Sequence, residues 1–158
     1  MKKAIVGLFA LFVIGCSTDK TLTEAEQLKK DVATIDKYIV DNNILNVKED
    51  PSGLRYVVTA EPNPGGVKPL ATSTITVRYV GKLMSSGVVF DQRTTSAATF
   101  PLSGLIEGWI IGFQLLTKGS KATLYIPSKL GYGTTGSQTG VVPANSILIF
   151  DVELLDVK

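Results

Sequence analysis

Residues 106–119 read IEGWIIGFQLLTKG and hold the only tryptophan of the chain, Trp109, between two glycines. Trp109, Phe113 and Leu116 are spaced i, i+4 and i+7, as one face of a short helix requires. The Lys-Gly pair that ends the stretch predicts a cationic last turn and a C-terminal cap. On composition alone Trp109 is an ordinary core residue, and the segments around the helix decide what it packs against.

Strands are predicted on both sides of this helix, because apolar and polar residues alternate there. The clearest, TITVRYVGKLM at 74–84, has one face formed by Ile75, Val77, Tyr79 and Leu83. A Ser-Gly turn continues it as a hairpin. The remaining predicted strands span 54–60, 88–91, 121–127 and 146–155. Several strands and one short helix predict an α+β fold, in which an antiparallel sheet wraps on the helix.

A second helix is predicted as an N-terminal extension over residues 23–41. Thr23 and Glu26 have the spacing of a capping box, and an apolar stripe recurs on one face at Leu28, Val32, Ile35 and Ile39. Three uses of the stripe remain open: it docks on the domain, pairs with a second copy in a homodimer, or holds the domain away from a membrane. Docking or pairing is favoured, because an exposed apolar stripe promotes association.

The first residues, MKKAIVGLFALFVIGC, predict an export signal. Two lysines precede an apolar run at 4–14 that is too short to span a bilayer. Its end, VIGC, resembles the lipobox of bacterial lipoproteins, in which the cysteine, here Cys16, is acylated and becomes the new N-terminus. The alternative is a plain signal peptide with an incidental cysteine. Ser17 stands where an aspartate commonly retains lipoproteins in the inner membrane, so we expect a lipid-anchored envelope protein of the outer membrane.

The predicted segments are a signal peptide at 1–15, a lipidated tether at 16–22, a helix and linker at 23–50, and one folded domain at 51–158. Removal of the signal lowers the number of Lys and Arg from 16 to 14, which equals the 14 Asp and Glu. A balanced charge gives no support for a nucleic-acid partner.

The composition also narrows the chemistry of the chain. It has no histidine and a single cysteine, which excludes His-dependent triads, zinc sites with His ligands and a disulfide within the chain. The glycine-rich segments lack the spacing of nucleotide-binding loops. We therefore expect no metal and no cofactor.

Five segments carry a resemblance to a known family because they occur together in one order. They read ITVRYVGKL, SSGVVFD, LIEGWIIGFQLLTKGSKATLYIP, LGYG and VVPANSILIFDVELL. Over about residues 74–157 the chain resembles the FKBP-type peptidyl-prolyl cis-trans isomerases. The fold of that family, a five- or six-stranded antiparallel sheet curved around a short helix, agrees with the fold that the periodicity predicts.

The resemblance implies a proline pocket with Trp109 as its floor, where the small Gly108 and Gly112 let helix and sheet come close. The substrate-binding residues are then Tyr79, Phe100, Leu105, Ile106, Trp109, Val142 and Phe150, and the catalytic residues are Phe90, Asp91 and Tyr132. By the same resemblance, the Ile106 N–H and the Tyr132 hydroxyl donate hydrogen bonds to substrate carbonyls. Ordinary structural interpretations also exist: Phe150 as a core residue, Asp91 as a turn former and Tyr132 as a loop anchor.

The sequence departs from the family pattern at two places. Gln92-Arg93-Thr94 follows Asp91 where the family often has small serines, which makes Arg93 the nearest candidate partner of Asp91. The segment from Phe100 to Trp109 is shorter than in the common small members, and Ala98 stands where they have a second aromatic. The second departure argues against tight binding of the macrolide inhibitors that the family takes.

Prolyl isomerisation suits a chain of this composition. Rotation about the X-Pro amide makes and breaks no covalent bond and has a barrier of about 18 to 20 kcal/mol, so it needs no nucleophile, metal or titrating base. We expect an isomerase that acts on proline-containing polypeptides and assists the folding of exported proteins. The alternatives are a proline-binding module with little turnover and a structural lipoprotein whose N-terminal helix forms dimers.

Overall fold

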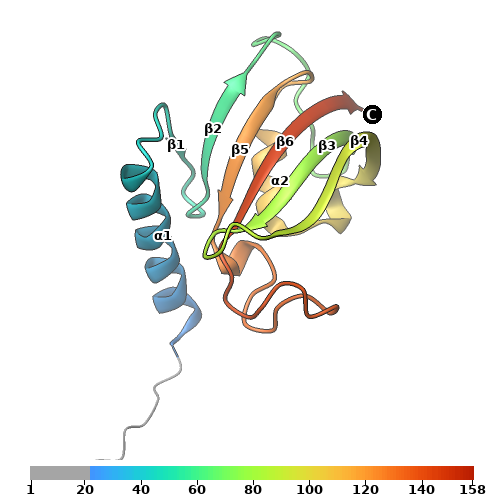
Figure 1. Cartoon of the computed structure of the whole chain (residues 1–158). Helices are drawn as coiled ribbons and strands as arrows, with labels where there is room; N and C mark the ends of the chain where they lie inside the picture. Colours follow the sequence, from blue (N-terminus) through green and yellow to red (C-terminus); the bar gives the residue numbers. More distant parts are fainter. Residues whose placement is uncertain (1–21) are drawn as a thin grey trace, which may run out of the picture.

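A six-stranded antiparallel sheet curves around a short helix in the computed structural model, which describes residues 22–158 (Figure 1). The helices are α1 (Glu24–Asp41) and α2 (Glu107–Gln114), with 3-10 turns η1 (Leu102–Gly104) and η2 (Ser128–Leu130). The strands are β1 (Lys48–Glu49), β2 (Arg55–Ala60), β3 (Thr74–Leu83), β4 (Val89–Pro101), β5 (Lys121–Ile126) and β6 (Leu148–Val157). They lie in the order β1-β2-β5-β6-β3-β4. The predicted α+β class and the curved antiparallel sheet are confirmed.

Part of the predicted N-terminal organisation lies outside the described residues. This holds for the signal peptide at 1–15, most of the tether and the lipidation site Cys16. Within residues 22–158, no helix is both long and apolar enough to cross a membrane. The division into a helix with linker at 23–50 and a domain at 51–158 stays a prediction.

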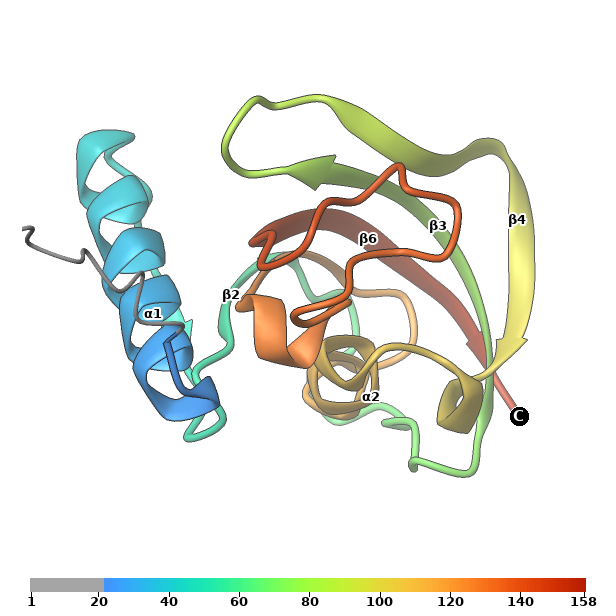
Figure 2. The same cartoon turned by 90° about the horizontal axis from the view of Figure 1, so that it is seen from below.

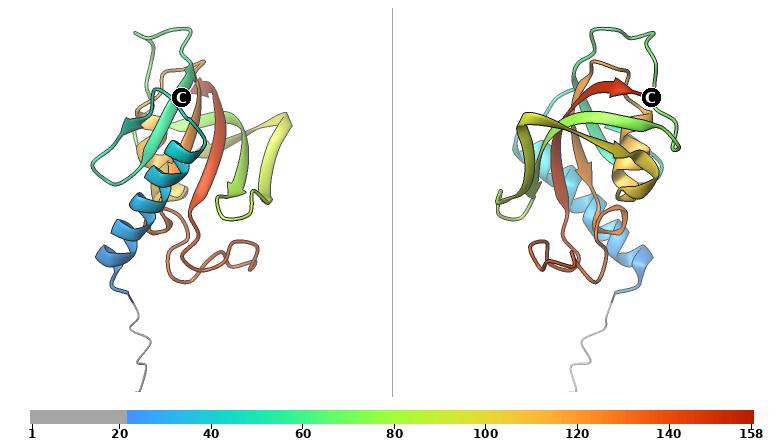
Figure 3. Two further views of the ribbon diagram at one scale, coloured as in Figure 1. Left: turned by 60° about the vertical axis from the view of Figure 1, so that its left-hand side comes forward. Right: turned by 90° about the vertical axis from the view of Figure 1, so that its right-hand side faces the viewer.

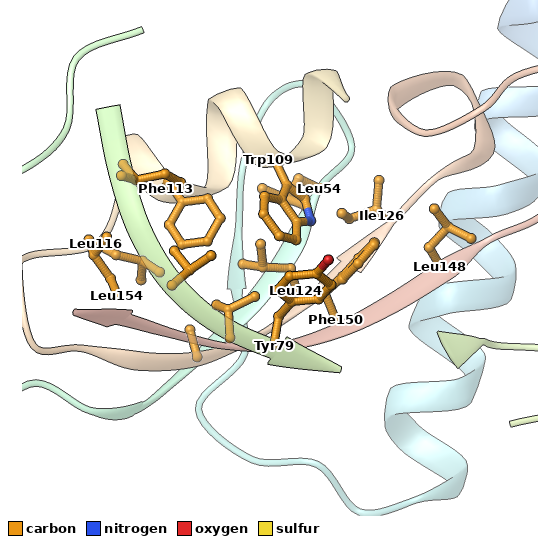
Figure 4. Packing of buried hydrophobic residues seen from close by; sticks show 14 of the residues in the cluster. Leu54, Tyr79, Trp109, Phe113, Leu116, Leu124, Ile126, Leu148, Phe150 and Leu154 are labelled. Atoms are coloured by element: carbon orange, nitrogen blue, oxygen red, sulfur yellow. The ribbon is translucent and has the colours of Figure 1, made fainter. Parts of the chain in front are cut away.

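The core lies in the hollow of the sheet, where α2 is enclosed (Figure 2, Figure 4). Trp109 of α2 is only 4% exposed, and Phe113 is fully buried. Alternate residues of β3, β5 and β6 meet them there, as the predicted strand alternation requires: Ile75, Val77, Tyr79, Ala122, Leu124, Ile126, Leu148, Phe150, Val152 and Leu154. The strand faces were therefore predicted correctly.

Two glycines let α2 lie directly on the sheet. A Cβ atom at Gly108 would lie 2.5 Å from Ile126 Cγ2, and one at Gly112 would lie 2.8 Å from Leu124 Cδ1. Carbon atoms do not pack so closely, so a larger residue at either position would push α2 away from β5. The close approach expected at these glycines is confirmed.

α1 packs on the opposite face of the sheet (Figure 3). Its Ile35 is fully buried against Tyr125 and Ile149, whose side chains point away from α2 because alternate residues of a strand face opposite sides. The capping box of Thr23 and Glu26 begins the helix as predicted. The apolar stripe therefore docks on the domain, which is one of the three uses that the sequence left open.

α2 is shorter than predicted. It ends at Gln114 with Leu115 as its C-cap, so the predicted cap at Lys118 and Gly119 is wrong. Gly119 instead lies in a turn with φ of 92°, where its N–H donates to the Leu154 carbonyl at 2.7 Å. The chain reverses here to enter β5, and the reversal uses the glycine that the pattern assigned to the helix.

The strand boundaries differ most at the edge of the sheet. β4 continues to Pro101, whereas the sequence predicted a strand only at 88–91. It pairs with β3 alone and most of its residues are exposed, so it lacks the alternation that reveals a half-buried strand. The predicted linker contains the two-residue strand β1, and β6 lies slightly C-terminal to the predicted 146–155.

Candidate functional site

A small cavity of about 160 Å³ lies beside α2 in the hollow of the sheet. Its lining comes from β3, β4, α2, β6 and the segments before α2 and after η2, and consists of Tyr79, Asp91, Phe100, Leu105, Ile106, Trp109, Tyr132 and Phe150. The family resemblance predicted all eight as site residues. Pockets for drug-sized ligands enclose about 300 to 1,000 Å³, so this cavity suits one small ring rather than a large ligand.

A larger hollow of about 390 Å³ lies on the outer face of the sheet. Its charged side chains are already paired, since Glu153 accepts from Arg78 at 3.3 Å and from Lys121 at 3.4 Å. No group of three or more metal-ligating side chains is found in the part of the chain that the structure describes. The cavity beside α2 is therefore the better candidate site.

The floor of the cavity is the Trp109 ring, which packs against several other aromatic rings, among them those of Tyr79, Phe113 and Phe150 (Figure 4). Its centroid lies 5.0 Å from that of Tyr79 and 5.1 Å from that of Phe150, both in edge-to-face geometry. The Phe113 and Phe100 rings also pack against it, with centroids 5.1 Å and 6.3 Å from that of Trp109. The buried indole N–H has no hydrogen-bond partner among the described residues. Packing alone fixes the ring, which gives a rigid apolar surface.

Asp91 stands at the rim and is held by a phenol. The Tyr79 hydroxyl donates to Asp91 Oδ2 at 2.7 Å. In the β3–β4 pairing Gly81 lies opposite Asp91, so Tyr79 is the diagonal neighbour of Asp91. Because Gly81 has no side chain, the Tyr79 ring can reach over it to Asp91. The expectation that Arg93 is the partner of Asp91 is therefore wrong. Arg93 lies opposite Tyr79 in the ladder and forms no ion pair among the described residues.

The phenols in the site keep their protons. Burial, and next the hydrogen bond to Asp91, raise the pKa of Tyr79. Burial, and next the charge of Asp91, raise the pKa of Tyr132. Both hydroxyls therefore remain donors at neutral and mildly alkaline pH, and no histidine is present to titrate there.

We expect the free energy of unfolding to fall in alkali because of these phenols. A raised folded pKa stabilises the protein fully below the unfolded value of about 10, and this contribution is lost as the pH rises through the folded value. Urea unfolding between about pH 8 and 11 measures the decline. The decline should be shallower in Tyr79→Phe, and an identical slope in that variant contradicts the shifted pKa of Tyr79.

Two hydrogen-bond donors of lining residues, the Ile106 N–H and the Tyr132 hydroxyl, have no partner within residues 22–158. Ile106 is the N-cap of α2, and its carbonyl accepts from Trp109 N at 2.9 Å and Ile110 N at 3.2 Å. Its own N–H, like the Tyr132 hydroxyl, donates to no group within residues 22–158. A helix N-terminus leaves such groups for a ligand. The site therefore combines an apolar floor with two donors that can meet carbonyl groups.

Two predicted site residues do not line the cavity. Phe90 stands behind the wall, edge to face with Phe150 at 5.5 Å and with Tyr132 at 6.4 Å. Val142 is 2% exposed and belongs to the core. Phe90 therefore packs against two lining rings without lining the cavity itself, and Val142 contributes to the core.

One residue of the site was missed. A Cβ atom at Gly81 on β3 would lie 2.6 Å from Phe150 Cε1 and 2.9 Å from Phe90 Cζ. The two rings thus rest on bare backbone. A glycine inside an alternating strand is a known sign of close approach, and this signal was available in the sequence.

The family follows from comparison with known proteins. A sequence model described as FKBP-type peptidyl-prolyl cis-trans isomerase matches residues 65–155. The chain belongs to this FKBP family. Among its relatives is the FKBP-type isomerase FkpA of Aeromonas hydrophila, 46% identical over 114 residues, a match that covers 71% of this chain and 41% of the relative. The chain thus spans about two fifths of the length of the curated FKBP proteins that it matches first.

Two solved structures have a similar fold. A peptidyl-prolyl cis-trans isomerase from Pseudomonas syringae superposes with a TM-score of 0.70 at 29% identity, covering 87% of this chain and 98% of that one. FkpA from Escherichia coli also gives 0.70, at 36% identity, covering 84% of this chain and 63% of that one. The match to the Pseudomonas protein extends over nearly all of that chain.

Proposed function

We propose that this FKBP-family chain is a peptidyl-prolyl cis-trans isomerase. The observation that carries the proposal is the small apolar cavity floored by Trp109, with the Tyr79–Asp91 pair at its rim. Its volume matches a single small ring, and its donors match the carbonyl groups on either side of a proline. No covalent chemistry is required of the site.

The proline ring lies on the face of Trp109, between the walls formed by Tyr79 and Phe150. Ile106 N–H and the Tyr132 hydroxyl donate to peptide carbonyls and hold the chain on both sides of the bond that turns. Resonance in the planar amide causes the barrier of about 18 to 20 kcal/mol, and the twisted amide loses the charge separation of resonance. An apolar cavity therefore favours the twisted state over the planar one.

Asp91 contributes an oriented charge beside the twisting amide. Tyr79 donates to its Oδ2, while Oδ1 has no partner among the described residues. The phenol fixes the direction of the carboxylate in advance, and such preorganisation avoids the cost of orienting it during the reaction.

The substrates that we propose are proline-containing segments of exported polypeptides. The support is the signal-like pattern of residues 1–16 and the lipobox-like end at Cys16. Uncatalysed X-Pro isomerisation takes tens to hundreds of seconds, long enough to expose unfolded chains to aggregation. A lipid-anchored isomerase in the cell envelope would shorten that exposure.

The test is the cis-to-trans rate of short X-Pro peptides with the chain from Ser17. Asp91→Ala should lower kcat/KM about tenfold or more, because it removes a charged partner. Tyr132→Phe should lower it about threefold to tenfold, the share of one hydrogen bond. Phe90→Ala should also lower it, by letting Phe150 shift.

Asp41→Ala serves as the control for Asp91→Ala, because Asp41 pairs only with Lys37 on α1 among the described residues. It should leave the rate unchanged. Peptide isomerisation no faster than in buffer, from a folded protein that still binds proline peptides, would replace the enzyme by a proline-binding module.

A further inference from the structure

A carboxylate of α1 is buried at the junction between this helix and the domain. Asp31 is 3% exposed. Its Oδ2 accepts from the Ser128 N–H at 2.8 Å and from the Ser128 hydroxyl at 2.5 Å, and its Oδ1 accepts from Gln27 Nε2 at 2.7 Å. Burial of a carboxylate is costly unless such partners satisfy it, so this contact is specific in a way that apolar packing is not.

Ser128 connects Asp31 to the backbone around Tyr132. It is the first residue of η2, which lies beside α1 (Figure 2). Its carbonyl accepts from Gly131 N at 3.0 Å and from Gly133 N at 2.9 Å, the two residues that flank Tyr132. Asp31 therefore accepts from both the N–H and the hydroxyl of Ser128. The carbonyl of Ser128 in turn accepts from the backbone N–H groups on either side of Tyr132.

We propose that Asp31 is a positioning residue of the proline site, which acts through Ser128 to place the Tyr132 hydroxyl. The proposal rests on the proposed function, in which Tyr132 donates to a substrate carbonyl. It makes α1 part of the working site, although no residue of α1 lines the cavity.

The surroundings of Asp31 explain why this one contact matters. A hollow of about 350 Å³ lies between the start of α1 and residues 133, 134 and 145 of the following loop, so α1 makes little apolar contact with that part of the loop. In the other strong polar contact of α1, Arg55 Nε donates to Asp36 Oδ1 at 2.9 Å. Arg55 lies on β2, so this contact does not reach η2. In the ion pair between Lys129 Nζ and Glu24 Oε2, 3.3 Å apart, both side chains are exposed, so the pair contributes little to stability.

Asp31→Ala and Asp36→Ala form a matched pair in the full-length chain purified in detergent. Both remove a carboxylate that joins α1 to the domain, but only the first reaches η2. Asp31→Ala is expected to lower kcat/KM for a proline peptide about threefold to tenfold and no more than Tyr132→Phe does, because a misplaced Tyr132 hydroxyl can lose at most the one hydrogen bond that it donates. Asp36→Ala should change it little. Asp31→Asn should restore most of the activity, because its amide oxygen still accepts from Ser128.

A double-mutant cycle shows whether Asp31 acts through Tyr132. In the Tyr132→Phe background, Asp31→Ala should cause almost no further loss, because coupled residues are not additive. Full additivity, or an equal loss in Asp36→Ala, overturns the proposal. If Asp31→Ala does not fold, Ser128→Ala takes its place in the cycle, since it removes the shorter of the two bonds.

Amide hydrogen exchange separates this proposal from the proposed function. Exchange at Gly131 and Gly133 should accelerate in Asp31→Ala and stay unchanged in Asp36→Ala, whether or not the protein turns over peptides. A wild-type protein without isomerase activity would end the proposed function only. Unchanged exchange at both glycines in Asp31→Ala would end the positioning role even in an active enzyme.

Discussion

Trp109→Ala is expected to weaken binding of a proline peptide about a hundredfold, as truncation of a central aromatic anchor does. The side chain supplies the whole floor of the cavity and contacts Tyr79, Phe100 and Phe150, so its removal opens the cavity and frees the walls. The same change should lower the free energy of unfolding by about 3 to 5 kcal/mol. Fluorescence anisotropy of a labelled peptide measures the first effect, and urea unfolding measures the second.

Leu116→Ala separates the two effects of Trp109→Ala. Leu116 is fully buried in the same core but does not line the cavity. It should lower the free energy of unfolding by about 2 to 5 kcal/mol and leave peptide binding nearly intact, at a temperature where both variants are folded. Equal weakening in the two variants would mean that core stability, and not the floor of the cavity, controls binding.

The sequence predicted those elements in which burial has a strict period. β3, β5 and β6 lie between α2 on one side and α1 or solvent on the other, so their apolar residues alternate and their faces could be assigned. β4 could not be found beyond Asp91, because an edge strand with exposed side chains leaves no such pattern. The end of α2 was misplaced for a similar reason: Lys118 and Gly119 have the chemistry of a helix end but serve a turn.

The site was predicted as a set of residues and not as a set of contacts. The family resemblance named all eight lining residues, but the partner of Asp91 depends on the register between β3 and β4, which shifts beside Tyr79 and again after Gly81. No spacing in the sequence reveals that shift. Asp31 was missed because its partner Ser128 lies 97 residues away in the chain, and a polar residue within a helix looks solvated until that contact is known.

Gly81→Ala is expected to reduce both stability and activity, because the rings of Phe90 and Phe150 rest on Gly81. Gly81→Ala places a methyl group where Phe150 Cε1 and Phe90 Cζ lie within 3 Å. Phe150 is 3% exposed and lines the cavity, so a displaced ring enters the space that we assign to the proline. Overpacking of this kind costs about 1 to 3 kcal/mol of stability, and a displacement of the pocket wall by about 1 Å should lower kcat/KM up to about a hundredfold.

Gly65→Ala is the control for Gly81→Ala, because a methyl group at Gly65 meets no atom within 4 Å. Both changes have the same effect on the unfolded chain, so the difference between the two variants reports the folded site alone. If the pocket needs bare backbone at β3, Gly81→Ala loses activity and Gly65→Ala does not. Wild-type kinetics in Gly81→Ala would show that the rings of Phe90 and Phe150 move without consequence, and that their position does not determine turnover.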